Sequence, residues 1–307
     1  MIDTTASNKR RTATISIAAL LSTLGLLLLS YAYFIEPSRL VVTSSDIRIA
    51  GWSKELDGLR IVAISDIHGG SNGADDERLR QLVKTTNAVD PDLVVLLGDY
   101  VSQTGSSGND GKRGLRMPVA TVADHLSGLR SKLGVFAVLG NHDGWHGDEE
   151  IARELTSRRI QVLDGGLATV QHNGASLRIL GLKDQLKIDS WEAYTADART
   201  LLAPTEGMGD VIILEHSPDV APIITAGEPI SKNLRLMIAG HTHGGQVWLP
   251  VLGRPIVPSG YGQRYAAGHT RDKGLDMFVT TGVGTSILPF RFMVPPEIAV
   301  LTIRSAD

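Results

Sequence analysis

MIAGHTHGGQVWLP, residues 237–250, is an apolar run that ends in two histidines one residue apart, followed at once by two glycines. The apolar run predicts a buried strand, and the glycines allow a sharp backbone turn directly after it. Side chains two residues apart in an extended segment point the same way, so His241 and His243 can serve one centre. This stretch predicts a strand whose carboxyl end carries a functional site.

Four other apolar runs, at 60–65, 92–97, 135–139 and 210–215, also lead into polar residues. In open α/β sheets the carboxyl ends of the strands form the edge where ligands bind. One Asp or His at a strand end is more often a helix cap, but five such ends are hard to explain by capping. Together the five ends supply seven candidate metal ligands: Asp66, His68, Asp99, Asn141, His216, His241 and His243.

The composition limits what these side chains bind. The chain has no cysteine among its 307 residues, and imidazole and carboxylate groups suit zinc, manganese and iron. One ion takes about four to six ligands, so seven candidates indicate two ions that share a ligand. A net charge of −3, without a dense Lys/Arg stripe, argues against a nucleic-acid partner.

Strand-like and helix-like segments alternate along the chain, which predicts an α/β domain whose sheets are covered by helices. Strands are expected at 39–44, 60–65, 92–99, 135–140, 161–166, 168–172, 177–182, 210–216, 234–241, 275–282 and 297–303. Helices are expected at 75–89, 118–133 and 147–159. The Gly/Ser-rich stretch 102–114 predicts a mobile loop.

The N-terminal segment 12–35 contains no charged residue and is long enough to cross a bilayer. A basic cluster at 9–11 precedes it, and aromatic residues lie at its far end. Both features predict an uncleaved single-pass anchor in the inner (cytoplasmic) membrane, with the catalytic domain outside the cytoplasm. Two alternatives stay open: cleavage at 30–32 as a signal peptide, and a twin-arginine signal at Arg10-Arg11.

The expected domain organisation follows from these segments. Residues 1–11 form a cytoplasmic N-terminus, and 12–35 form the transmembrane anchor or uncleaved signal. Residues 36–58 form a connecting segment with the first strand, and 59–307 form the catalytic domain.

The order of the motifs D-x-H, G-D, G-N-H-D, a lone His and G-H-T-H resembles the calcineurin-like binuclear metallophosphoesterases, over about 59–303. The segments GHTHGGQVWLP, GYGQRYAAGHT and GVGTSILPFRFMVPPEI are similar to the membrane-associated branch of that family. This branch borders on the enzymes that cleave the pyrophosphate of UDP-2,3-diacylglucosamine in lipid A synthesis. The resemblance implies a four-layer αββα sandwich that binds two divalent ions (Mn²⁺, Zn²⁺ or Fe²⁺).

The resemblance also implies a role for each motif residue. One ion would be held by Asp66, His68 and His243, and the other by Asn141, His216 and His241. Asp99 would bridge the two ions, and a metal-bridging hydroxide would attack phosphorus. His142 would stabilise or protonate the leaving oxygen.

One position departs from the family pattern. Many relatives read G-D-x-x-D after the second strand, and the second Asp orients the catalytic histidine. Here Ser102 stands at that place, which leaves two alternatives open: Asp143 or Asp66 substitutes for the missing carboxylate, or His142 is less strongly polarised.

Substrate contacts are expected from His146, which closely follows the G-N-H-D motif, and from Arg264, because guanidinium matches phosphate geometry. A surface salt bridge is the alternative for Arg264. The apolar loops at 247–258 and 287–296 would either touch lipid or pack under the site, and packing is the expectation for most of their side chains.

The leading functional hypothesis is a membrane-anchored hydrolase that cleaves a phosphodiester or pyrophosphate bond. One form of this hypothesis has a lipid-linked phosphate ester as the substrate. A UDP-2,3-diacylglucosamine pyrophosphohydrolase is the second hypothesis, although its substrate is expected in the cytoplasm. A catalytically silent, metal-bound scaffold is the third. The sequence carries no signal for the oligomeric state.

Overall fold

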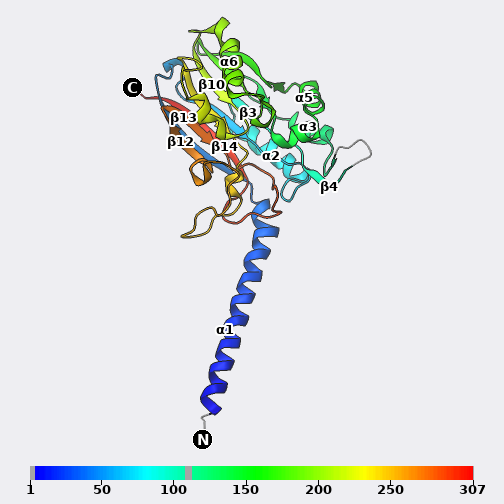
Figure 1. Cartoon of the computed structure of the whole chain (residues 1–307). Coiled ribbons are helices and arrows are strands. Elements are labelled where there is room, and N and C mark those ends of the chain that lie inside the picture. Colours follow the sequence, from blue (N-terminus) through cyan, green and yellow to red (C-terminus); the bar gives the residue numbers. More distant parts are fainter. Residues whose placement is uncertain (1–3, 108–112, 307) are drawn as a thin grey trace.

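The computed structural model describes residues 4–107 and 113–306 (Figure 1). Twelve of its strands form two sheets of six strands each. The order in the first sheet is β1 (Val41–Ala50), β14 (Glu297–Ala306), β2 (Leu59–Ile64), β3 (Leu93–Leu97), β6 (Val135–Val138) and β7 (Gln161–Val162). The order in the second sheet is β12 (Gly268–Asp272), β13 (Leu275–Val279), β11 (Leu234–Ala239), β10 (Asp210–Leu214), β9 (Ala175–Gly181) and β8 (Gly166–His172).

The two sheets pack face to face, and their inner faces form one apolar core that includes Val95 of β3 and Ile212 of β10. A second core lies on the outer face of the first sheet, under α2 (Asp76–Ala88), α3 (Val119–Leu126) and α5 (Asp148–Ser157). The third lies under α6 (Trp191–Leu202) and α7 (Ala221–Ile224) on the second sheet. The predicted four-layer αββα sandwich is confirmed.

Short elements connect these layers. They are α4 (Asn141–His146), η2 (Glu36–Ser38), η3 (Lys54–Leu56), η4 (Gln185–Lys187), η5 (Ala203–Thr205), η6 (Pro218–Val220), η7 (His243–Gly245) and η8 (Gly262–Tyr265).

The structure corrects four details of the predicted elements. The helix expected at 118–133 ends at Leu126, because Ser127 and Gly128 follow it and glycine disfavours a helix interior. The stretch expected as a loop at 102–114 forms the hairpin β4 (Gln103–Ser107) and β5 (Arg113–Leu115), and residues 108–112 lie outside the described residues.

The other two corrections are elements that were not expected from the sequence. The helix α6 buries Tyr194, Ala198 and Leu202 at helical spacing behind the N-cap Ser190, a signal that was present in the sequence. The edge strand β12 is mostly polar, and only its pairing with β13 defines it.

The N-terminal helix α1 (Thr4–Ser30) projects away from the two sheets (Figure 1) and continues as a π-helical turn, η1 (Tyr31–Ile35). Within the described residues, Thr12–Ser38 is the one helical stretch long and apolar enough to cross a membrane, and its most apolar window is fully exposed.

The two sheets approach each other closely where β11 ends, at Gly240. A Cβ added there would lie 1.9 Å from Ser65 Oγ and 2.6 Å from Asp66 Oδ2. We expect Gly240→Ala to lower the free energy of unfolding by about 1–3 kcal/mol, because overpacking forces neighbouring side chains aside. Urea denaturation measures this change. Gly105→Ala is the control, since no described atom lies within 4 Å of its added Cβ; an equal loss there would contradict the packing argument.

Candidate metal centre

The seven predicted ligands all lie where the carboxyl ends of the two sheets meet. Asp66, Asp99 and Asn141 follow β2, β3 and β6, which are parallel neighbours in the first sheet. His216 and His241 follow the parallel strands β10 and β11 of the second sheet. Because both sets of strands end at the same edge, side chains far apart in sequence are brought together.

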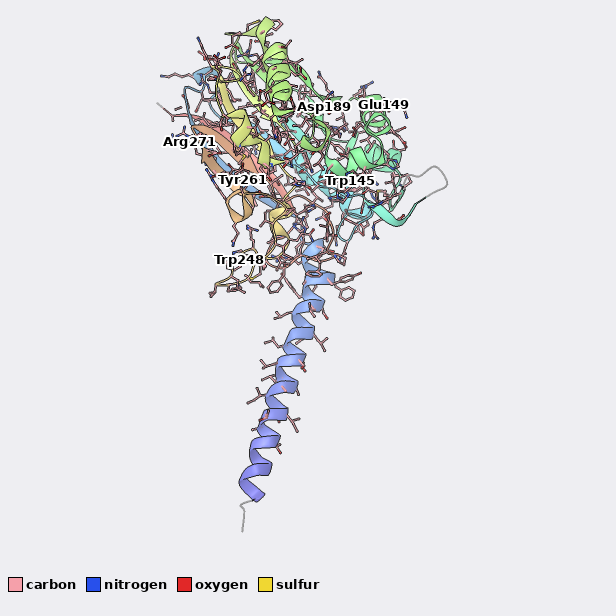
Figure 2. All side chains as sticks on the ribbon, viewed as in Figure 1. Trp145, Glu149, Asp189, Trp248, Tyr261 and Arg271 are labelled. Carbon is pink, nitrogen blue, oxygen red and sulfur yellow. The ribbon has the colours of Figure 1, made fainter. Side chains whose placement is uncertain are left out.

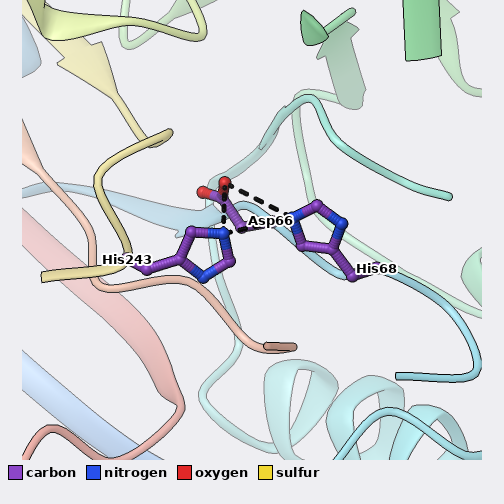
Figure 3. A group of neighbouring side chains, drawn as sticks. All are labelled: Asp66, His68 and His243. Atoms are coloured by element: carbon purple, nitrogen blue, oxygen red, sulfur yellow. Dashed lines mark hydrogen bonds and ion pairs between the residues drawn. The ribbon is translucent and has the colours of Figure 1, made fainter. Parts of the chain in front are cut away.

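Asp66, His68 and His243 form a first group, and their polar atoms converge on one point (Figure 3). The two Nε2 atoms of the histidines are 3.1 Å apart. The Oδ1 atom of Asp66 lies 3.2 Å from His243 Nε2 and 4.0 Å from His68 Nε2.

Asn141, His216 and His241 form a second group beside the first. His216 Nε2 lies 3.1 Å from Asn141 Oδ1 and 3.1 Å from His241 Nδ1. Asp99 stands between the groups: its Oδ2 is 3.3 Å from His216 Nε2 and 3.5 Å from His68 Nε2. One carboxylate oxygen therefore faces both groups.

Backbone carbonyls orient two of the imidazole rings. His216 Nδ1 donates to Leu97 O at 2.7 Å, and His68 Nδ1 donates to Val101 O at 3.2 Å. With the proton on Nδ1, the lone pair of Nε2 points into the centre, which is how ligating histidines are usually fixed.

Burial sets the charge state of the site. It lowers the pKa of His68 and of His241 to about 4, so both rings are neutral at pH 7 and offer lone pairs. Burial opposes ionisation of Asp99, but His216 and His68 hold the pKa of that carboxyl well below its usual range. Burial opposes the charged form of His216, but Asp99 raises the pKa of that ring well above its usual value. The neutral rings of His68 and His241 and the ionised carboxylate of Asp99 are donors that suit a divalent cation.

The backbone at the site is strained. Five of the seven residues have a positive φ: Asp66 at 52°, His68 at 46°, Asp99 at 58°, His241 at 69° and His243 at 50°. Side-chain-bearing residues rarely adopt this conformation, and such strain gathers at functional sites. Asp66 Oδ1 is also buried without a hydrogen-bond partner among the described residues. A cation held by the group would satisfy this oxygen, so the residues fit a metal.

His142 lies at the edge of the centre, with its ring centroid 4.7 Å from that of His68. Its Nδ1 donates to Gln103 Oε1 at 2.6 Å, and Gln103 Nε2 donates back to the carbonyl of His142 at 2.6 Å. Its Nε2 lies 3.5 Å from Ser286 Oγ. His142 also belongs, with His68 and Asp99, to a group whose donor atoms fall within 4.8 Å of one another.

Gln103 therefore contacts His142 in the place considered for Asp143 or Asp66, and this partner is a neutral amide. Asp143 is fully buried and accepts from the backbone N–H groups of Asp99, Tyr100 and Gly140, at 2.8–2.9 Å. Its carboxylate ties the loops after β3 and β6 together instead. Gln103 does not stand out in the sequence, because it lies in the stretch expected as a mobile loop.

We expect Gln103→Leu to lower the kcat of phosphoester hydrolysis by about 10–100-fold with little change in KM, a typical cost of losing an orienting partner. Gln103→Glu, which keeps the acceptor oxygen, should retain most of the activity. Steady-state kinetics with metal analysis measures both variants. Equal activity of wild type and Gln103→Leu would show that the contact does not orient His142.

Two cavities border His142. An apolar cavity of about 310 Å³ runs from Asp99, Asn141 and His241 to Ile256 and Ile287. A more polar cavity of about 630 Å³ also borders His142. It is lined by Gln103, Arg113, Arg116, Asn72 and Tyr33, among others.

The two predicted substrate contacts lie elsewhere within the described part of the chain. Neither His146 nor Arg264 lines these cavities. His146 Nε2 lies 3.7 Å from Glu150, and Arg264 is paired with Asp272 at 2.6 Å. Trp145, whose ring centroid is 4.6 Å from that of His142, lines both cavities instead. The ion pair of Arg264 matches the surface salt bridge that was its alternative interpretation.

Comparison with known proteins supports this site. Residues 59–245, more than half of the chain, match the family described as calcineurin-like phosphoesterase. The chain belongs to this family. Its members use divalent metals, and membership supports a hydrolase of phosphate esters.

Three relatives illustrate the likeness. An uncharacterised metallophosphoesterase of Bacillus subtilis, YkuE, is 29% identical over 90% of both chains. The phosphodiesterase YaeI of Escherichia coli is 29% identical over 69% of this chain and 70% of its own length. A transmembrane protein with a metallophosphoesterase domain from Danio rerio is 27% identical over 86% of this chain, which spans 57% of that protein.

Proposed function

We propose that this protein is a membrane-anchored phosphoesterase with two metal ions, which hydrolyses a phosphodiester or pyrophosphate bond. The observation that carries the proposal is Asp99 Oδ2, which faces a histidine of each donor group at 3.3 and 3.5 Å. One ion would be held by Asp66, His68 and His243. The other would be held by Asn141, His216 and His241, and Asp99 would bind both ions. Divalent ions bound there supply a nucleophile at neutral pH and neutralise phosphate charge.

The other steps fall to the chain's own residues. Gln103 accepts the Nδ1 proton of His142, so a proton carried on Nε2 is free to reach the leaving oxygen of a substrate in the adjoining cavities. Such general acid help contributes about 10²–10⁴-fold to the rate. Trp145 lies beside His142, with its ring centroid 4.6 Å from that of the histidine, and lines both cavities.

The membrane anchor is the second part of the proposal. Segment 12–35 would cross the inner membrane, with residues 1–11 in the cytoplasm and 59–307 as the catalytic domain outside. The apolar helix α1 and the transmembrane relative from Danio rerio support the anchor. The connecting segment 36–58 contributes β1, which pairs with β14 in the first sheet. The phosphodiesterase relative YaeI supports a diester as substrate.

The test is metal-dependent hydrolysis of bis(p-nitrophenyl) phosphate by the full chain, stripped of metal and then supplied with manganese, zinc or iron. Turnover that returns with metal supports the proposal, and p-nitrophenyl phosphate compares a monoester with the diester. If the chain binds two ions but cleaves no phosphate ester, including UDP-2,3-diacylglucosamine, the catalytically silent scaffold is the better description.

A further inference from the structure

A set of large apolar side chains is exposed on two loops beside the metal centre, residues 247–256 and 286–293. Val251 and Ile287 are almost completely exposed, and Leu252 and Ile256 are 68% and 69% exposed. The predicted packing holds for Trp248, Leu249 and Phe292, which are half-buried. Clustered exposed apolar residues on a folded domain mark an interaction surface.

These loops lie at the end of the domain from which α1 projects (Figure 1). Figure 2 shows Trp248 beside this junction, whereas Glu149 and Asp189 lie well away from it. The loop after β13 is bonded directly to the end of the apolar helix, because Arg291 N donates to Ala32 O at 3.0 Å. Asn72 Nδ2 donates both to Tyr33 O at 2.7 Å and to Pro289 O at 2.8 Å.

The anchor and the loops therefore form one continuous surface. The last turns of the helix expose Phe34 and Ile35, and the helical stretch ends at Ser38. Hydrogen bonds hold 286–293 at the level of this end, and Trp248 N donates to Phe292 O at 2.9 Å, which ties loop 247–256 to the same place. The exposed side chains of both loops therefore lie near the end of the proposed anchor.

Both cavities at His142 border this surface. Ile256 and Ile287 line the apolar cavity, and Ile287 also borders the polar cavity. The polar cavity reaches Tyr33 at the end of the anchor and carries Arg113 and Arg116. An apolar cavity and a cavity that carries two arginines, both bordering the same histidine, match an amphiphile with an anionic head.

We infer that loops 247–256 and 286–293 rest on the lipid bilayer, and that the site takes amphiphilic phosphoesters from its surface. The substrate inference rests on the proposed function. Its chain would lie along Ile256 and Ile287, and its anionic head would face Arg113 and Arg116. An apolar face that meets lipid headgroups needs no protein partner to cover it.

The first test places probes on the full chain in vesicles of phosphatidylglycerol and phosphatidylcholine. The protein has no cysteine, so Val251→Cys and Leu252→Cys each give a single site for a spin label. We expect oxygen to reach both labels more readily than a water-soluble nickel complex does. Labels at Glu149→Cys and Asp189→Cys should show the reverse. If all four labels are equally open to the nickel complex, the bilayer contact is wrong.

The second test compares two diesters with the same leaving group, p-nitrophenyl hexadecyl phosphate in vesicles and p-nitrophenyl methyl phosphate in solution. In each, water adds to phosphorus and p-nitrophenolate leaves. We expect the double variant Val251→Asp/Leu252→Asp to lose about tenfold on the hexadecyl diester and to keep its activity on the methyl diester. The control Leu186→Asp, another exposed apolar position, should change neither rate.

The two tests separate the surface from the proposed function. Equal rates of the wild type and the double variant on the hexadecyl diester, or equal losses on both diesters, would overturn the substrate inference. The labels report bilayer contact without any activity. Wild type that cleaves neither diester would contradict the proposed function, while the labels would still decide whether the loops meet lipid.

Discussion

Replacing Asp99 by asparagine is expected to lower phosphodiester hydrolysis by at least about 10³-fold and to reduce the metal content of the protein. The variant puts a neutral amide where the carboxylate oxygen faces His68 and His216. An amide nitrogen at that place donates, and it cannot be shared between two cations. Turnover of bis(p-nitrophenyl) phosphate and metal analysis by mass spectrometry measure the two effects.

Asp210→Asn is the matched control. Asp210 is also a buried aspartate and pairs with Arg235 at 2.8 Å, but it begins β10, whereas His216 follows the other end of that strand. We expect a loss of stability there with metal content unchanged. If Asp99→Asn keeps both ions and full turnover, Asp99 does not bridge the site.

Replacing His142 by alanine is expected to lower kcat by about 10²–10⁴-fold while both ions stay bound, because the variant removes a proton donor and no ligand. The loss should be largest for substrates with poor leaving groups, which depend most on protonation. Kinetics with p-nitrophenyl and alkyl leaving groups, together with metal analysis, measures it.

His125→Ala is the control for this variant, since it removes an imidazole that pairs with Asp76 on the surface of α2 and α3. It should leave turnover unchanged. A fall in the metal content of His142→Ala would show instead that His142 is a metal ligand. Its donor atom lies close enough to those of His68 and Asp99 for that role.

The sequence alone was sufficient to place the candidate ligands. Each strand that leads into a candidate ligand can be predicted from local sequence. Its apolar residues identify the strand, and the polar residue and glycine that follow identify its end. Parallel strands must also end at a common edge, so the convergence of Asp66, Asp99 and His216 could be expected without coordinates. The αββα layers were implied by the family resemblance.

Only the tertiary structure decided what surrounds these ligands. Gln103 reaches His142 because β4 and β5 pair, and that pairing joins residues whose own sequence is typical of a loop. Arg264 has a charge suited to phosphate, yet it lies in η8 and pairs with Asp272 at the end of β12. Whether an apolar loop residue is half-buried, like Phe292, or exposed, like Ile287, depends on which other segment covers it. Such contacts are long-range, and residue type alone does not encode them.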